Sequence, residues 1–154
     1  MSFLSSLKRA KNFVTGGGAD VSVNVIDPSL SEIFTVIITA QANQQLEIDK
    51  VYLTLRCQEE QEYEVTNEEG EREEEEDVRT LFKQTFPFSD ALVMEEGQKL
   101  QWQRTIDLRD VELPASYEEE TYDGEYEIEW KAFAGLDVSG NDPDSGWIEF
   151  EMGA

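Results

Sequence analysis

The chain has 154 residues, of which 39% are hydrophobic, and this suits a single domain with one core rather than a disordered chain. Its 35 acidic residues outnumber its 12 basic residues and give a formal net charge of -23. Nucleic acid is excluded as a partner, because phosphate binding needs clustered lysine and arginine. The acidity instead favours cations and basic protein surfaces, and it also suits a high-salt cytoplasm, where screening relieves self-repulsion.

The sequence contains no histidine. This removes the usual general base, the commonest zinc ligand, and the Ser-His-Asp and Cys-His arrangements of nucleophilic catalysis. We therefore expect a protein that is not an enzyme and has no cofactor.

The first residues predict a short amphipathic helix ended by a glycine linker. Phe3, Leu7 and Val14 follow helical spacing, and basic side chains occupy the other side. This apolar stripe either docks on the domain, lies on an anionic membrane or in a partner groove, or mediates self-association. We assign residues 1–18 to the helix and linker and residues 19–154 to one domain.

Targeting signals also bear on location. No run of residues is long enough to span a bilayer, and the start lacks the apolar core of a secretory signal. Cys57 is the single cysteine, so no intramolecular disulfide can form, and it sits in an apolar alternation typical of a buried core residue. We expect a cytoplasmic protein.

Strand patterns follow at short intervals, with no helical pattern between them. The predicted strands cover residues 21–25, 34–39, 46–57, 60–66, 78–86, 91–94, 97–114, 125–133 and 147–152. The alternation shifts near Asp49 and Lys50, which indicates a bulge. In residues 97–114, Arg104 interrupts the apolar face and indicates a bulge or a strand edge. This order predicts an all-β, antiparallel, immunoglobulin-like β-sandwich.

Residues 67–77 form an acidic segment between two predicted hairpin strands. Its like charges predict a solvated, mobile loop, and the alternative is an acidic arm that binds a basic protein surface. The candidate binding residues are Glu68, Glu69, Glu71, Glu73, Glu74, Glu75 and Glu76.

Three carboxylates alternate along a later strand, at Glu125, Glu127 and Glu129. They therefore share one sheet face, where paired carboxylates could hydrolyse a glycosidic bond. The pattern is similar to the acidic strand of jelly-roll β-glucanases, with Glu127 in place of an aspartate. The simpler interpretation is the wet face of a strand whose other face is apolar.

Residues 137–146 are rich in oxygen ligands. Asp137, Asn141, Asp142 and Asp144 are candidates for weak calcium binding, although the segment fails the EF-hand pattern. The alternative is a turn, since Asn-Asp-Pro and Ser-Gly are common turn formers. With the basic helix, this loop could form a peripheral membrane or calcium-dependent module of C2 type.

The arrangement of these segments resembles the arrestin-like β-sandwich, and within it the bacterial sporulation-control proteins of the stage-zero M type. The resemblance lies in the helix and glycine linker, residues 46–55 (LEIDKVYLTL), Glu96-Gly97 before a strand ending in Leu113-Pro114, and the last two strands. The Pro-Gly turn usual between the first two strands is missing, and the chain has the length of one of the two halves of an arrestin.

The resemblance implies a non-enzymatic adaptor or scaffold that acts through protein contacts. We expect a protein partner, possibly with a basic surface. A peripheral membrane or calcium-dependent module and, more remotely, a carbohydrate-active enzyme are the alternatives.

Overall fold

The computed structural model describes residues 18–114 and 125–153. The predicted helix, with Phe3, Leu7 and Val14, lies outside these residues. The described part is all strand and connection, and it contains no helix that is long and apolar enough to cross a membrane.

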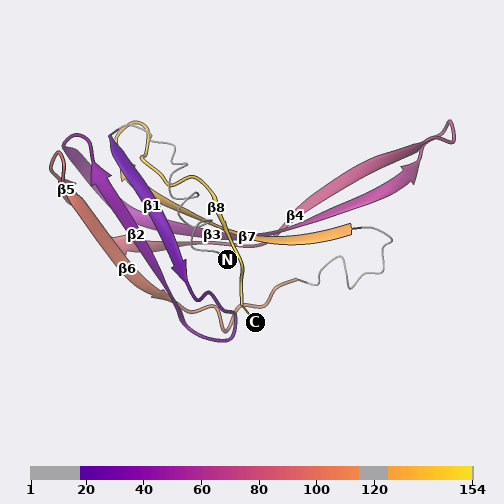
Figure 1. Ribbon diagram of the computed structural model, residues 1–154, viewed down its shortest axis with the longest axis horizontal. Helices are drawn as coiled ribbons and strands as arrows, with labels where there is room; N and C mark the ends of the chain where they lie inside the picture. Colours follow the sequence, from indigo (N-terminus) through magenta and orange to yellow (C-terminus); the bar gives the residue numbers. More distant parts are fainter. Residues whose placement is uncertain (1–17, 115–124, 154) are drawn as a thin grey trace.

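Within the described residues, eight strands form two antiparallel sheets (Figure 1). The first sheet has the order β1-β2-β6, and its strands are β1 (Ala19–Ile26), β2 (Phe34–Ala42) and β6 (Lys99–Ile106). The second has the order β4-β3-β7-β8, with β5 also paired to β3. Its strands are β3 (Leu46–Thr66), β4 (Arg72–Ser89), β5 (Leu92–Met94), β7 (Glu125–Val138) and β8 (Ile148–Phe150).

The core lies between the two sheets. Val36 and Ile38 of β2 belong to one core cluster with Val51 and Leu53 of β3, and all four side chains are fully buried. Alternate residues of β2 are buried, as expected for strands that place one face on a core. Two antiparallel sheets packed in this way confirm the predicted all-β sandwich.

The structure tests one irregularity and two strand boundaries that the sequence predicted. The bulge near Asp49 and Lys50 is confirmed by a register shift between Ile48 and Lys50 in the pairing of β3 with β7. The two strands predicted at residues 46–57 and 60–66 are one continuous strand of 21 residues. The strand predicted at residues 97–114 ends at Ile106, well before Pro114.

The predicted loop at residues 67–77 was also wrong in extent. Its second half belongs to β4, which begins at Arg72, and a five-residue turn remains at residues 67–71. Asn67 orders this turn, because its Oδ1 accepts hydrogen bonds from the backbone N–H groups of Glu69 (3.0 Å) and Glu71 (2.9 Å). Gly70 adopts a φ of 81°, which glycine reaches without strain.

Arg104 lies in an edge strand, as one of the two interpretations predicted, and without a bulge in the β2–β6 register. Its guanidinium donates to the carbonyl oxygen of Pro87 on β4 and lies 5.5 Å from the ring centre of Phe86. Arg104 therefore joins the edges of the two sheets rather than interrupting one of them.

Candidate functional site

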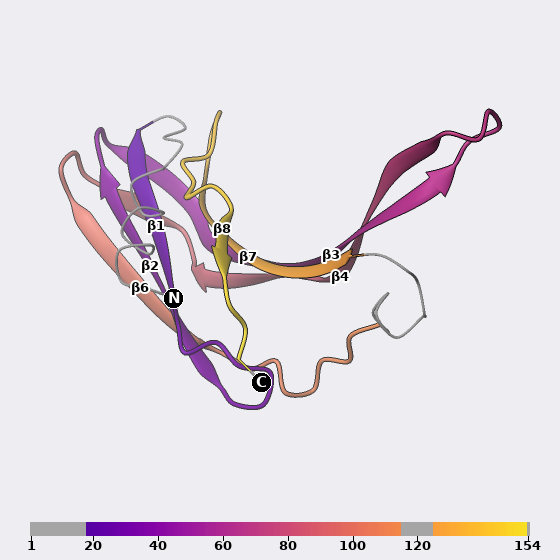
Figure 2. The same cartoon turned by 45° about the vertical axis from the view of Figure 1, so that its right-hand side comes forward.

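Part of the second sheet extends beyond the sandwich as a projection (Figures 1 and 2). We call this projection the arm, and it consists of residues 58–66 of β3, residues 72–80 of β4 and residues 125–129 of β7. It begins where the register of β3 and β4 shifts between Cys57 and Gln58, which inserts the extra residue Leu81. At the rise of an extended strand, its nine β3 residues span about 30 Å.

The pairing register assigns the arm residues to two faces. Residues directly opposite one another in an antiparallel pair share a face, and successive residues alternate. Leu55, Cys57, Glu59 and Gln61 are alternate residues of β3, and all four are buried. Glu59 and Gln61 therefore lie on the same side of the sheet as the core residues, which we call the inner face. Among the described side chains, the outer face carries seven carboxylates, from Glu60, Glu62, Glu64, Glu74, Glu76, Glu127 and Glu129.

The sequence-predicted binding residues are therefore divided rather than gathered on one face. Glu68, Glu69 and Glu71 are exposed in the turn. Glu74 and Glu76 belong to the outer face, whereas Glu73 and Glu75 belong to the inner face. These four glutamates of β4 are all exposed, so β4 presents carboxylates on both of its faces.

Like charges stand directly opposite one another on the outer face. Glu62 pairs with Glu76, Glu64 with Glu74, and Glu60 with Glu127. The surroundings of Glu60 raise the pKa of its carboxyl above the usual value, first through desolvation and then through repulsion by Glu76, Glu129 and Glu127. The arm therefore keeps a strand geometry that its charges oppose.

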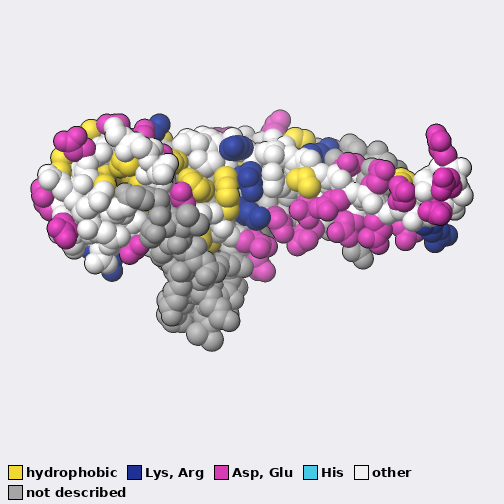
Figure 3. All heavy atoms as spheres, turned by 90° about the horizontal axis from the view of Figure 1, so that it is seen from above, with side chains coloured by type: hydrophobic (Ala, Val, Ile, Leu, Met, Phe, Trp, Pro, Cys, Tyr) yellow, Lys and Arg dark blue, Asp and Glu magenta, His cyan; other side chains and the backbone are white. Residues whose placement is uncertain are grey.

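A row of basic residues crosses the outer face at the base of the arm. Arg56 of β3 stands opposite both Lys83 of β4 and Lys131 of β7. The guanidinium carbon of Arg56 lies 3.9 Å from the ring centre of Trp147, a cation–π contact. Figure 3 shows the resulting separation, with blue side chains beside a long magenta field.

We expect salt and mild acid to order the arm. Like charges directly opposite one another on neighbouring strands are destabilising, so these three pairs favour local opening of the arm. The folded-state pKa of Glu60 is raised, so its contribution to stability is present at low pH and is lost as the pH rises through that pKa. Hydrogen-exchange protection of residues 72–77 should therefore rise on acidification, and about tenfold between roughly 0.1 and 1 M salt.

The backbone amides of β2 serve as the internal control for this measurement, because their neighbours are apolar core residues. A loss of arm protection at high salt would contradict the electrostatic interpretation of the outer face.

The inner face contains an ion pair that sequence reasoning missed. Glu59 is fully buried, and its Oε1 accepts hydrogen bonds from Nε (3.1 Å) and Nη2 (3.0 Å) of Arg79. The two residues stand directly opposite each other on β3 and β4. Glu59 follows Leu55 and Cys57 at a spacing of two residues, so it belongs to the same strand face. This spacing was the one signal in the sequence that pointed to the burial of Glu59.

Of the three predicted glycosidase carboxylates, Glu127 and Glu129 lie on the outer face, and the side chain of Glu125 lies outside the described part of the structure. The described side chains, Glu127 and Glu129, form with Glu149 of β8 a group whose carboxylate oxygens lie within 4.8 Å of one another. Glu129 also contacts Lys131, with 3.5 Å between its Oε2 and the lysine Nζ. Glu127 and Glu149 are exposed, so the arrangement agrees with the wet face of a strand.

Of the calcium candidates, Asp137 lies near the end of β7, and Asn141, Asp142 and Asp144 lie in the connection between β7 and β8. Oδ1 of Asp142 accepts a hydrogen bond from the backbone N–H of Val138 (3.0 Å), and Tyr52 donates to its Oδ2 (3.4 Å). Oδ1 of Asp144 accepts from the N–H of Gly146 (2.8 Å). The carboxylates of Asp142 and Asp144 thus form contacts within the connection and with the end of β7. Calcium binding by these residues, with Asp137 and Asn141, stays a prediction.

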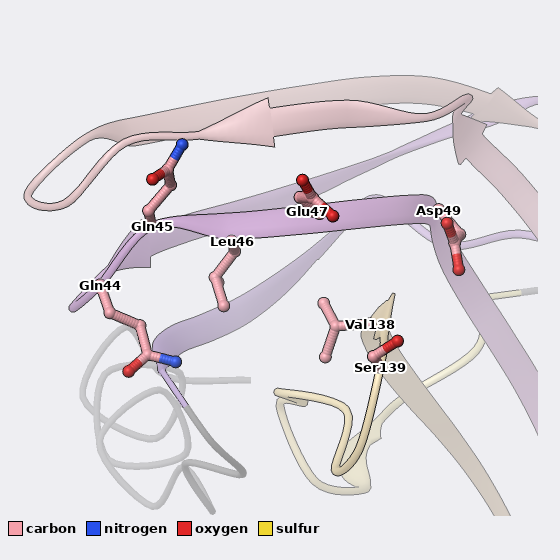
Figure 4. Close-up of a pocket in the computed structure, with 7 residues that line it drawn as sticks. All are labelled: Gln44, Gln45, Leu46, Glu47, Asp49, Val138 and Ser139. Atoms are coloured by element: carbon pink, nitrogen blue, oxygen red, sulfur yellow. The ribbon is translucent and has the colours of Figure 1, made fainter.

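A hollow of about 330 Å³ lies beside this connection, where it meets the start of β3 (Figure 4). Glu47 and Asp49 line it from β3, and Val138 and Ser139 line it from the end of β7. The hollow is open and lacks a nucleophile paired with a base in its lining, so it offers binding area rather than a catalytic arrangement.

Comparisons with known proteins place the fold. No protein-family model matches the chain, and no curated protein matches it. Among solved structures, the crystal structure of Spo0M, a sporulation control protein from Bacillus subtilis, matches with a TM-score of 0.58 at 16% sequence identity. The match covers 90% of this chain and 51% of that one, so the chain spans about half the length of that protein. The chain therefore has the arrestin-like fold of this sporulation control protein, as the resemblance in its sequence predicted.

Proposed function

We propose that the protein is a non-enzymatic adaptor or scaffold of the cytoplasm, which binds a protein partner with a basic surface through the arm. The observation that carries this proposal is the arm itself. It projects from the sandwich, and in three of its cross-strand pairs one glutamate stands directly opposite another. A surface whose charges oppose its own strand pairing is relieved when a partner of opposite charge covers it.

The likeness to a sporulation control protein, at 16% identity, concerns the fold alone. The absence of histidine from the sequence supports a binding role as well, since the usual general base is missing.

The test compares partner capture by three forms of the chain. The first is the unaltered chain. The arm variant carries Glu62→Gln, Glu64→Gln, Glu74→Gln and Glu76→Gln. A control variant removes the same charge from four exposed acids away from the arm, at Glu47, Glu95, Glu96 and Glu112.

We expect a protein from native lysate to bind the unaltered chain and the control variant, and to lose about tenfold in affinity for the arm variant, as each lost charge contact is worth a few tenths of a kcal/mol. Equal weakening by both variants would assign the effect to net charge alone and would contradict the proposed role of the arm.

A further inference from the structure

We propose that the arm binds its partner by adding a strand: an extended, lysine- or arginine-rich segment of another protein pairs with the outer edge of the terminal strand β4 at residues 72–79. This inference rests on the proposed adaptor function and specifies the surface and the partner chemistry. Peptides commonly bind in this way, because main-chain hydrogen bonds supply affinity while side chains supply specificity.

The first argument is the position of β4. It is the terminal strand of its sheet and pairs with β3 on one side, and no other strand in residues 18–114 and 125–153 pairs with it. The edge of an antiparallel sheet presents N–H and C=O groups of alternate residues that have no partner strand. In the arm this edge projects away from the sandwich (Figure 2).

The part of β4 near the core is different. Pro87 has no N–H to donate, and its carbonyl oxygen accepts a hydrogen bond from Arg104 of β6. The edge is therefore closed beside the sandwich and open along the arm, which limits strand addition to residues 72–79.

The second argument is the regularity of the open edge. The register of β3 and β4 advances one residue at a time from Gln58 opposite Thr80 to Thr66 opposite Arg72. Bulges and prolines, which natural proteins use to blunt an exposed edge, are absent from this stretch of the pairing. The backbone is thus suited to a further strand.

The third argument is charge, which selects the occupant. Residues 73–77 are all acidic and exposed, with Glu74 and Glu76 on the outer face and Glu73, Glu75 and Asp77 on the inner face. A second copy of this chain would place the same carboxylates against them, and like charges directly opposite are destabilising. A basic strand meets a carboxylate at each position from residue 73 to residue 77.

This pattern has a consequence for specificity. A shift of one residue in register normally moves every side chain of a strand to the wrong face. Here both faces of β4 are acidic, so a basic strand that slips by one residue still meets carboxylates. Binding should therefore depend on basic content and on a free backbone, and only weakly on the order of residues.

The test uses a ten-residue peptide that alternates lysine and threonine, with blocked termini. A matched peptide carries backbone N-methyl groups on its four central residues, which keeps all charges but removes the central N–H donors along both edges. Affinity is measured by calorimetry with the full chain, and hydrogen exchange reports on the amides of β4.

We expect the unmodified peptide to bind, to protect amides within residues 72–79, and to lose about tenfold in affinity on methylation, a loss of about 1.4 kcal/mol. The variant Glu74→Gln with Glu76→Gln should weaken binding similarly, whereas Glu95→Gln with Glu96→Gln should not. Failure of the unmodified peptide to bind would overturn the proposal, and so would equal affinity for the two peptides.

These outcomes are distinct from those of the lysate experiment. If the two peptides bind equally while the arm variant still loses its cellular partner, strand addition is wrong and the adaptor function stands. If strand addition is observed while capture from lysate is insensitive to the arm charges, the proposed function is wrong and the edge keeps its intrinsic affinity for basic strands.

Discussion

Replacing Arg79 with leucine is expected to destabilise the protein by about 3 kcal/mol, because removing one partner of a buried ion pair leaves a charge in the interior. Glu59 is fully buried, whereas the Arg79 side chain is 28% exposed. For a domain of this size, this loss lowers the melting temperature by roughly 6 to 12 °C. Urea unfolding followed by tryptophan fluorescence measures it directly.

The same strand offers a matched control. Arg72 pairs with Glu64 at 3.5 Å, but the two side chains are 81% and 60% exposed. Exposed pairs of this kind contribute less than about 1 kcal/mol, so Arg72→Leu should be nearly neutral. Replacing both Glu59 and Arg79 with leucine should recover most of the lost stability. An Arg79→Leu variant as stable as Arg72→Leu would contradict the importance assigned to the buried pair.

The second large effect is expected at Gly135 of β7, which is buried and stands directly opposite Tyr52 of β3. A Cβ atom at this position would overlap the hydroxyl and ring of Tyr52. Gly135→Ala should therefore displace the ring and cost about 2 to 3 kcal/mol, in the range of other overpacked sites. In a Tyr52→Ala background the same substitution should cost under about 1 kcal/mol, and this coupling is the test.

Tyr52 also provides a spectroscopic readout of the displacement. Desolvation, followed by the charge and hydrogen bond of Asp142, raises the pKa of Tyr52 to about 12 from a usual value of 10. The raised pKa means that its contribution to stability is complete below pH 10 and is lost as the pH rises through 12. If Gly135→Ala moves the ring from Asp142, phenolate absorbance should appear at lower pH. An unchanged titration would show that the ring stays in place.

The sequence predicted the core of the fold well, because period-two alternation follows burial directly. Val36, Ile38, Val51 and Leu53 alternate with polar or half-buried neighbours and are all fully buried. Cys57, which continues the β3 pattern, is buried as predicted, and burial raises the pKa of its thiol to about 11.

The arm was harder to predict, because its local signals disagree with its pairing. Glutamate is depleted in strands, and the run at residues 73–77 therefore predicted a loop. The partner strand overrides this preference, since residues 58–66 of β3 pair with β4 without interruption. The strand that ends at Ile106 was predicted to be too long, because Leu108 fits the apolar alternation. Leu108 is indeed buried, but it does not belong to a strand.

The ion pair of Glu59 and Arg79 depends on a register that the sequence does not reveal. The two residues are 20 positions apart, and the single-residue shift between Cys57 and Gln58 brings them opposite each other. Without that shift, their side chains would belong to opposite faces of the sheet.

The unbroken length of β3 has a mechanical consequence. The same strand is a central member of the sheet in the core, between β4 and β7, and the middle member of the arm. A partner that pulls on the arm along its length therefore loads the hydrogen bonds on both sides of β3 in shear, where many must fail together. A partner that pulls across the arm would peel β4 from β3 one bond at a time, starting at the turn. The protein should resist the first kind of tension far better than the second.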